Sequence, residues 1–382
     1  MRILISGGGT GGHVYPALAV ADALKAIAAI AQDRPAAEVL YVGSLGGMEK
    51  GIVARAGLPY QEIDAGQVRG ITPLALLQNI RHLWRGYQQA HALLSVWPAD
   101  VVFITGGYVT VPLSLAAWRR AIPVMIYLPD LQPGWAVRFL SHLATRIAVS
   151  FDEVRPSFPG TRRQKKVWVS GYPVRAAFFE AEADRLAGYQ SLGLDSALKT
   201  VLVFGGSRGA RSINQAIGAV AAELIAHCQI VHVSGELDWP QVREEHDRLP
   251  AEVRSRYHVY PYLHEEMIAA MAVADLAIAR AGAATTAEFP AMGLPSILVP
   301  YPYAGQHQGR NADFMAAHGA AVRIDDADLH AQLKPTVTRL LQDEAMLKEM
   351  RARALALSRP SAAHHLAAEL QRLAHSRRGK AP

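Results

Sequence analysis

Short apolar runs alternate with longer amphipathic stretches along most of the chain. In the first half the apolar runs predict buried strands at Arg2–Ser6, Val39–Val42, Val101–Thr105, Val124–Tyr127 and Ile147–Val149. Helical patterns lie between them, at Leu18–Ala28, Met48–Ala56 and Val111–Arg119. Strands and helices that alternate in this way are typical of a parallel, doubly wound sheet.

The second half repeats this plan. It predicts strands at Val201–Phe204, Ile230–Val233, His258–Tyr260, Leu276–Ala279 and Ser296–Val299. A strand at Val167–Ser170 precedes Arg175, where we place the hinge, and Ala362–Ala374 has a helical pattern before a frayed tail at Arg377–Pro382. We therefore expect an α/β fold of two Rossmann-like, doubly wound domains that face a cleft. The first comprises residues 1–174, with a helix at 359–378 packing back on it, and the second comprises residues 175–358.

A glycine-rich turn follows the first strand of each half. Five glycines fall within the six positions Gly7–Gly12, and Gly205–Ala210 has the same character. Such a turn lets a ligand approach the backbone and directs the N–H groups of the next helix toward it. Pro16 suits the first turn of that helix, because its missing N–H needs no partner there.

Composition narrows the choice of compartment and partner. The chain has 382 residues, 51% of them hydrophobic, and its single cysteine, Cys228, excludes an intrachain disulfide and suits a reducing cytosol. No run approaches the ~20 apolar residues of a membrane span. Residues 1–174 carry 17 Lys and Arg against 10 Asp and Glu, a charge of +7. A basic half suits anionic lipid or a phosphorylated substrate, and without a nucleic-acid-binding motif we expect no nucleic-acid partner.

The first glycine turn also fits a dinucleotide fingerprint. Gly7, Gly9 and Gly12 satisfy G-x-G-x-x-G, but the second strand ends at Tyr41–Ser44 without the carboxylate that binds ribose hydroxyls. This absence argues against a nicotinamide oxidoreductase. The turn is better suited to a phosphate or a sugar.

Two polar clusters in the second half suit a sugar nucleotide. A strand ends at Arg280 and a helix begins near Thr285, so the amides of residues 283–286 can hold a diphosphate. Glu288, one turn later, can accept two ribose hydroxyls or simply cap the helix. The loop Pro302–Asn311 adds several hydrogen-bonding groups: Gln306, His307, Gln308 and Asn311. These groups suit binding of a polyhydroxylated ring, and the alternative is an ordinary solvated loop.

These motifs together resemble the MurG family of UDP-N-acetylglucosamine–N-acetylmuramyl-(pentapeptide) pyrophosphoryl-undecaprenol N-acetylglucosaminyltransferases. The segments that carry the resemblance are Gly8–His13, Thr105–Thr110, Gly205–Ala210, Arg280–Glu288 and His307–Asn311, in the family's order and spacing. The resemblance implies a glycosyltransferase B fold and transfer of N-acetylglucosamine to O4 of the muramic acid of lipid I, which forms lipid II for peptidoglycan. It implies UDP-N-acetylglucosamine, undecaprenyl-linked lipid I and the anionic inner membrane surface as partners, and a peripheral location on the cytoplasmic face.

The resemblance also implies site residues. Glu288 would hold the ribose and Tyr262 and Leu263 the uracil. Ser207 and Arg175 would contact the diphosphate, and His307 and Gln308 the sugar. The full donor set is Thr10, Gly11, Gly12, Arg175, Ser207, Tyr262, Leu263, Arg280, Ala283, Ala284, Thr285, Glu288, His307 and Gln308. We expect no cofactor and no metal.

His13 is the candidate general base, because an imidazole with a pKa near neutrality can take the proton of an attacking hydroxyl. Its alternative role is to hold the glycine turn. Where the family usually has His-Glu-Gln-Asn, this chain has Tyr127-Leu-Pro-Asp130, and Tyr172 replaces a common asparagine. Asp130 can therefore bind a sugar hydroxyl or compete with His13 as the base, and this departure leaves the acceptor open.

An apolar segment edged by arginines is the candidate membrane-facing patch. It includes Ile71, Leu77 and Trp84, with Arg81 and Arg85 beside them, and Tyr108 joins the acceptor side. The alternative is a core-facing amphipathic helix. For the whole chain, the alternatives to lipid I transfer are a UDP-sugar transferase with another acceptor, and a non-enzymatic sensor or scaffold that binds the sugar nucleotide.

Overall fold

The computed structural model describes residues 1–30, 37–66, 73–206, 209–264, 266–303 and 307–379. The chain forms two compact units. Unit 1 comprises Met1–Arg175 together with Arg359–Pro382, and unit 2 comprises Ala176–Ser358. Each unit is described by itself.

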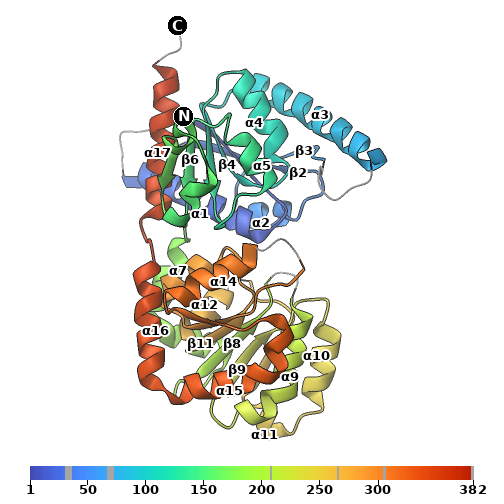
Figure 1. Ribbon diagram of the computed structural model, residues 1–382, viewed down its shortest axis with the longest axis vertical. Helices are drawn as coiled ribbons and strands as arrows, with labels where there is room; N and C mark the ends of the chain where they lie inside the picture. Colours follow the sequence, from blue (N-terminus) through green and yellow to red (C-terminus); the bar gives the residue numbers. More distant parts are fainter. Residues whose placement is uncertain (31–36, 67–72, 207–208, 265, 304–306, 380–382) are drawn as a thin grey trace. The chain divides into compact units, whose positions relative to one another are not determined.

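Unit 1 is built on a seven-stranded sheet in the order β3-β2-β1-β4-β5-β6-β7, in which every pair is parallel. Its strands are β1 (Arg2–Gly7), β2 (Glu38–Ser44), β3 (Tyr60–Ile63), β4 (Val101–Gly106), β5 (Val124–Leu128), β6 (Arg146–Val149) and β7 (Val167–Val169). Its helices are α1 (Gly11–Ile30), α2 (Glu49–Arg55), α3 (Pro73–Val96), α4 (Thr110–Arg119), α5 (Trp135–Leu140), α6 (Thr161–Gln164) and α17 (Ala362–Arg378). β1 and β4 are apolar and buried because helices cover the sheet (Figure 1).

Helix α1 begins earlier than the sequence predicts. It starts at Gly11 inside the glycine turn, so Pro16 lies within the helix rather than in its first turn. The carbonyl of Thr10 accepts from the N–H groups of His13 (3.1 Å) and Val14 (3.4 Å), which closes the first turn ahead of the proline. By length and composition α1 could also cross a membrane, but half of its apolar stretch is buried and it packs on β1, β4 and α17, as a core helix does.

The C-terminal helix α17 belongs to unit 1. It packs along α1 through an apolar face that is buried from Leu366 to Ala374 (Figure 1). The helix continues to Arg378, and the Arg377 guanidinium bonds to the carbonyl of Ala99, so the expected fraying at Arg377 is wrong. An anchored cation at this position fits the helix C-terminus.

Unit 2 has a parallel six-stranded sheet in the order β10-β9-β8-β11-β12-β13. Its strands are β8 (Thr200–Phe204), β9 (Gln229–Val233), β10 (Tyr257–Tyr260), β11 (Leu276–Ala279), β12 (Ser296–Leu298) and β13 (Ala321–Arg323). Its helices are α7 (Ala176–Ala183), α8 (Arg185–Leu192), α9 (Arg211–Leu224), α10 (Trp239–Asp247), α11 (Ala251–Arg254), α12 (Glu266–Val273), α13 (Thr285–Met292), α14 (His307–Ala317), α15 (Leu329–Gln342) and α16 (Glu344–Leu357). The two doubly wound sheets confirm the predicted fold class.

A buried histidine links the strands of unit 2. The Nε2–H of His232 donates to Asn214 Oδ1 (2.9 Å), and the Tyr257 hydroxyl donates to His232 Nδ1 (2.8 Å). Because burial disfavours the charged form of the ring, the pKa of His232 is lowered to about 4.

This histidine should make the fold sensitive to acid. Between pH 6.5 and pH 4 this histidine is protonated in the unfolded chain but stays neutral in the folded protein. The free energy of unfolding is therefore highest above pH 6.5 and decreases as the pH falls through this range. We expect a loss of about 3 kcal/mol across this range. Urea unfolding against pH measures it, and His232→Gln should flatten the curve relative to His375→Gln, an exposed control. Identical slopes in both variants would contradict the prediction.

Candidate functional site

The site residues of unit 1 lie where its strand order reverses. β1 lies between β2 and β4, and ligands of open α/β sheets bind outside the carboxyl ends of strands at this point. The turn Gly7–Gly12 follows β1, and Gly106 ends β4 beside it. The N–H of Gly8 donates to Gly106 O (3.2 Å), and Thr105 Oγ1 donates to His13 O (2.6 Å). The two turns are therefore joined.

His13 has a defined orientation in this turn. Its Nδ1 lies 3.0 Å from Gly8 O, and because a carbonyl can only accept, Nδ1 carries the proton in this bond. The Nε2 atom of the neutral ring then carries a lone pair. A Cβ on Gly106 would lie 2.8 Å from this Nε2, and Gly106 has φ +129°, so only glycine fits there. His13 thus both holds the turn and presents a basic nitrogen.

Glu49 lies against this turn and is not predicted from the sequence. A carboxylate does lie at the end of β2, but it comes from the first residue of α2, five positions beyond Ser44. Glu49 Oε1 accepts from the Ser44 N–H (2.7 Å) and from Ser44 Oγ (2.5 Å), and the side chain is fully buried. A buried carboxylate cannot bind ribose hydroxyls from outside, so the argument against a nicotinamide cofactor stands. The sequence signal for Glu49 is a carboxylate a few positions after the end of the second strand.

The site residues of unit 2 lie at a corresponding reversal, between β8 and β11. After β11, the turn Gly282–Ala284 leads into α13. The N–H groups of Thr285 and Thr286 already donate to Gly282 O and Ala283 O (3.2 Å each), so of the amides proposed for the diphosphate only those of Ala283 and Ala284 are left for a ligand. The Thr285 hydroxyl likewise donates to Gly282 O (2.6 Å). Glu288 lies in the first turn of α13 and is partly exposed.

Helix α14 is tied to the same turn. Asn311 is buried and its Nδ2 donates to Ala281 O (3.0 Å), while its Oδ1 has no hydrogen-bond partner among the described residues. Gln308 Oε1 accepts from the Tyr301 N–H (2.9 Å), which leaves its amide N–H groups to donate to a ligand. The side chain of His307 lies outside the described residues, and so does Ser207.

Other predicted donor residues take distinct places. The Arg280 guanidinium pairs with Asp326 and donates to Ser212 and to two carbonyls that follow β12, those of Val299 and Pro300. It also lies over the Tyr301 ring, 5.4 Å from the ring centroid. This placement favours a supporting role for Arg280 over direct contact with the donor. Tyr262 and Leu263 follow edge strand β10, with Leu263 buried. Arg175 ends the first part of unit 1 and lies over the Tyr15 ring at 5.0 Å.

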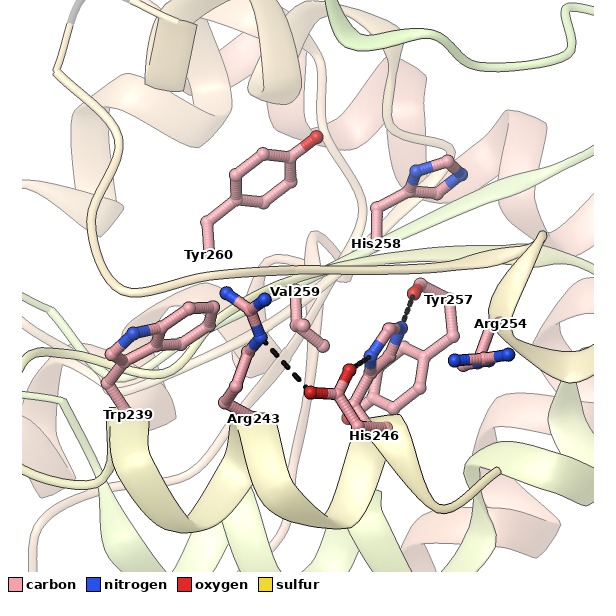
Figure 2. A pocket seen from close by; sticks show the side chains of 9 residues that line it. Trp239, Arg243, His246, Arg254, Tyr257, His258, Val259 and Tyr260 are labelled. Carbon is pink, nitrogen blue, oxygen red and sulfur yellow. Dashed lines mark hydrogen bonds and ion pairs between the residues drawn. The ribbon is translucent and has the colours of Figure 1, made fainter. Parts of the chain in front are cut away.

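A hollow of about 280 Å³ lies apart from these residues, between α10 and the outer edge of β10 (Figure 2). Several of its polar groups pair with one another. His246 Nε2 donates to Tyr257 O (3.0 Å), Arg243 bonds to Asp247 (3.3 Å), and Arg243 also lies over the Trp239 ring at 5.6 Å. These contacts cover an edge strand that leads into Tyr262. We interpret the side chains around the hollow as structural support for the segment that contains Tyr262.

Helix α3 presents an apolar, basic face. Ile80 and Trp84 lie one turn apart and are 49% and 60% exposed, with Arg81 and Arg85 exposed beside them. The opposite side of the helix packs on α4, next to which it lies in Figure 1. A purely core-facing role therefore does not hold for Ile80 and Trp84. Ile71 and the side chain of Leu77 lie outside the described residues, and Tyr108 follows Gly107 at the end of β4, half-buried.

Comparison with known proteins identifies the family. The glycosyltransferase family 28 N-terminal domain matches residues 3–149, and the family 28 C-terminal domain matches residues 200–366. The chain belongs to glycosyltransferase family 28. Within the described residues, no three His, Cys, Asp or Glu side chains gather as metal ligands.

Relatives in this family match over nearly their full length. The UDP-N-acetylglucosamine–N-acetylmuramyl-(pentapeptide) pyrophosphoryl-undecaprenol N-acetylglucosamine transferase of Roseiflexus sp. (strain RS-1) is 41% identical, over 98% of this chain and 95% of that protein. The enzyme of the same name from Desulforamulus reducens is 38% identical, over 95% and 96%. The crystal structure of Acinetobacter baumannii MurG superposes with a TM-score of 0.71 at 26% identity, over 97% and 99%. The chain is therefore a member of the MurG family.

The departure from the family pattern is partly a change of core packing. Tyr127 is fully buried and its hydroxyl bonds to Ser150 Oγ (2.7 Å). Its ring meets that of Tyr172, the other departure, edge to face at a centroid distance of 6.1 Å. Burial raises the pKa of Tyr127 well above its usual value, so it stays neutral. Of the changed positions, Asp130 alone brings a partly exposed charged group to the carboxyl end of β5.

Proposed function

We propose that this protein transfers N-acetylglucosamine from UDP-N-acetylglucosamine to O4 of the muramic acid of undecaprenyl-linked lipid I, which forms lipid II for peptidoglycan. The similarity to transferases of this name over nearly the whole chain carries the proposal. The glycine turns and polar groups at the carboxyl ends of both sheets supply the chemistry that this reaction needs.

In the mechanism we propose, His13 Nε2 takes the proton of the acceptor hydroxyl. The bond from O4 to the anomeric carbon forms as the bond from that carbon to the phosphate oxygen breaks, and UDP leaves with the electron pair. One displacement inverts the centre and gives a β-linkage. The Nδ1–H bond to Gly8 O favours this role, because it fixes the tautomer whose Nε2 is basic.

On the donor side, we assign the ribose to Glu288 and the diphosphate to the amides of Ala283 and Ala284, with Ser207 and Arg175. Fixed amides at a helix start stabilise the charge that collects on the leaving UDP. We assign the sugar hydroxyls to Gln308 and His307, and the uracil to Tyr262 and Leu263. The bond from Gln308 Oε1 to the Tyr301 N–H supports this assignment, because it leaves the amide N–H groups of Gln308 to donate to a sugar hydroxyl.

The decisive test of this function is transfer of labelled N-acetylglucosamine to a short-chain lipid I analogue. We expect a β-1,4-linked disaccharide product that depends on UDP-N-acetylglucosamine. Donor binding without transfer would support the second candidate, a UDP-sugar transferase with a different acceptor, which Asp130 favours. An acceptor panel would then identify that substrate.

We also propose that the protein works as a peripheral protein on the cytoplasmic face of the cell membrane, with the exposed face of α3 against anionic lipid. Ile80 and Trp84 supply apolar area, and Arg81 and Arg85 supply charge.

Removing this apolar area should weaken membrane binding. Burying one such side chain is worth about 1.5–3 kcal/mol, so Ile80→Ser with Trp84→Ser should lower partitioning onto anionic vesicles by at least about tenfold. Vesicle sedimentation measures the change. Val96→Ser, exposed at the other end of α3, should bind like the parent protein. Unchanged binding of the double variant would remove α3 from the membrane surface.

A further inference from the structure

Tyr15 is a half-buried aromatic residue near the start of α1, two positions after His13. Its ring packs against the first glycine turn, because a Cβ on Gly11 would lie only 3.1 Å from the Tyr15 Cε2 atom. The guanidinium carbon of Arg175 lies 5.0 Å from the centroid of the same ring. A cation within about 6 Å of a ring centroid is attracted by the negative face of the ring. Tyr15 therefore joins Arg175 to the first glycine turn.

Arg175 stands at a special point of the chain. It is the last residue of the first part of unit 1, and Ala176 begins both unit 2 and α7. Its guanidinium lies on a side chain of α1, so it is held to unit 1 at the point where the chain leaves that unit. An arginine side chain has many rotamers, and a contact that restricts them before a substrate binds lowers the entropy that binding must overcome. The contact with Tyr15 thus pre-organises the cation.

An aromatic ring can hold a guanidinium in a way that a carboxylate cannot. Arg280, for example, pairs with Asp326, whose carboxylate cancels the charge of the arginine. An uncharged ring contacts the flat face of the guanidinium, and this contact leaves the charge and the N–H edge for another partner. The contact with Tyr15 is therefore suited to an arginine whose charge is used on a phosphate.

The proposed general base belongs to the same helix start. Residues two positions apart on an α-helix project about 200° apart, so His13 and Tyr15 face different sides of α1. His13 Nδ1 meets the carbonyl of Gly8, and the Tyr15 ring carries Arg175. The spacing between the basic nitrogen and the guanidinium is thus set within one element of unit 1.

From this arrangement we propose that Tyr15 is a positioning residue that fixes the Arg175 guanidinium at the spacing from His13 that sugar transfer requires. In the proposed displacement, His13 takes the proton of the acceptor hydroxyl while negative charge collects on the leaving diphosphate. A base and a cation are needed at the same moment, and holding both on α1 keeps them in the productive geometry. The inference rests on the proposed function, in which Arg175 contacts the diphosphate.

Kinetics of ring variants test this role. Tyr15→Leu removes the ring, so we expect kcat with a lipid I analogue to fall by about 5- to 30-fold, the upper part of the range for a cation–π contact, because both side chains are half-buried. Tyr15→Phe keeps the ring and should retain the parent rate. Phenylalanines at position 15 with one, two and three ring fluorines weaken the negative face of the ring at nearly constant size, so they should lower kcat stepwise.

The matched control is Trp97→Leu, which removes the ring under Arg2 in the same unit, 5.8 Å from that guanidinium, and should behave like the parent. Equal rates across the fluorinated series would reduce Tyr15 to a packing role and overturn the inference. A Tyr15→Phe variant as slow as Tyr15→Leu would also overturn it, because the effect would then belong to the hydroxyl.

Calorimetric titration with UDP tests the same contact without any turnover. We expect Tyr15→Leu to weaken UDP binding in the parent protein and to have no further effect in Arg175→Gln, because the ring acts through the guanidinium. An equal loss in both backgrounds would show that Tyr15 acts independently of Arg175. If the parent transfers no sugar to lipid I, the proposed function fails, while this cycle still decides whether Tyr15 holds Arg175 for a phosphate.

Discussion

Replacing His13 with alanine is expected to lower kcat by about 10²- to 10⁴-fold, the range that a positioned general base contributes. The KM for UDP-N-acetylglucosamine should stay nearly unchanged, because we assign none of the donor contacts to His13. We expect the fall in kcat because the Nδ1–H bond to Gly8 O leaves Nε2 as the basic atom that takes the proton. Initial rates with a lipid I analogue measure both parameters.

The matched control for this variant is His365→Ala, which removes an exposed histidine of α17 in the same unit. It should keep full activity. If His13→Ala also retains turnover, Asp130 becomes the better candidate for the base, and Asp130→Asn should then abolish transfer. A large rise in donor KM would instead assign His13 to substrate binding.

Replacing Glu288 with glutamine is expected to raise the KM for UDP-N-acetylglucosamine by about 10- to 100-fold. Hydrogen bonds to a charged group are worth about 1.5–3 kcal/mol, and a carboxylate can accept from two ribose hydroxyls. Calorimetric titration with UDP measures the loss of affinity directly. Thymidine diphosphate lacks the 2′-hydroxyl, so its affinity should differ less between the parent and the variant than the affinity of UDP does.

Glu344→Gln is the control for the alternative role of Glu288 as a helix cap. Glu344 is also an acidic residue in the first turn of a helix, α16, and is exposed. It should leave UDP affinity unchanged. If Glu288→Gln lowers only thermal stability, and by no more than Glu344→Gln does, Glu288 does not belong to the ribose site.

The sequence predicts most of the strands and the two glycine turns, because both depend on local patterns, but it misses two short edge strands, β3 and β13. Apolar runs define the buried strands of parallel sheets, and clustered glycines define turns that larger residues cannot form. The start of α1 is harder, since helix formation through Gly11 and Gly12 depends on Thr10 and on tertiary contacts such as Thr105 with His13. Propensity alone placed the start at Pro16.

The partners of polar side chains are the part that sequence cannot supply. Arg280 has the position of a donor ligand in the chain, yet Asp326, 46 residues later, holds its guanidinium. Tyr127 and Tyr172 look like two separate departures from a family pattern, and they prove to pack on each other. Glu49 meets Gly8 from a different element. In each case the deciding contact joins residues far apart in sequence.

The return of α17 to unit 1 has a consequence for synthesis of the protein on the ribosome. Residues 176–358 are translated between the two parts of unit 1. Until Ala362–Arg378 emerges, the face of α1 that α17 covers remains open to solvent, and the nascent chain carries an uncovered apolar helix. Unit 2, whose residues are continuous, can complete its fold first. The earliest-made half of the chain is therefore the last to be finished.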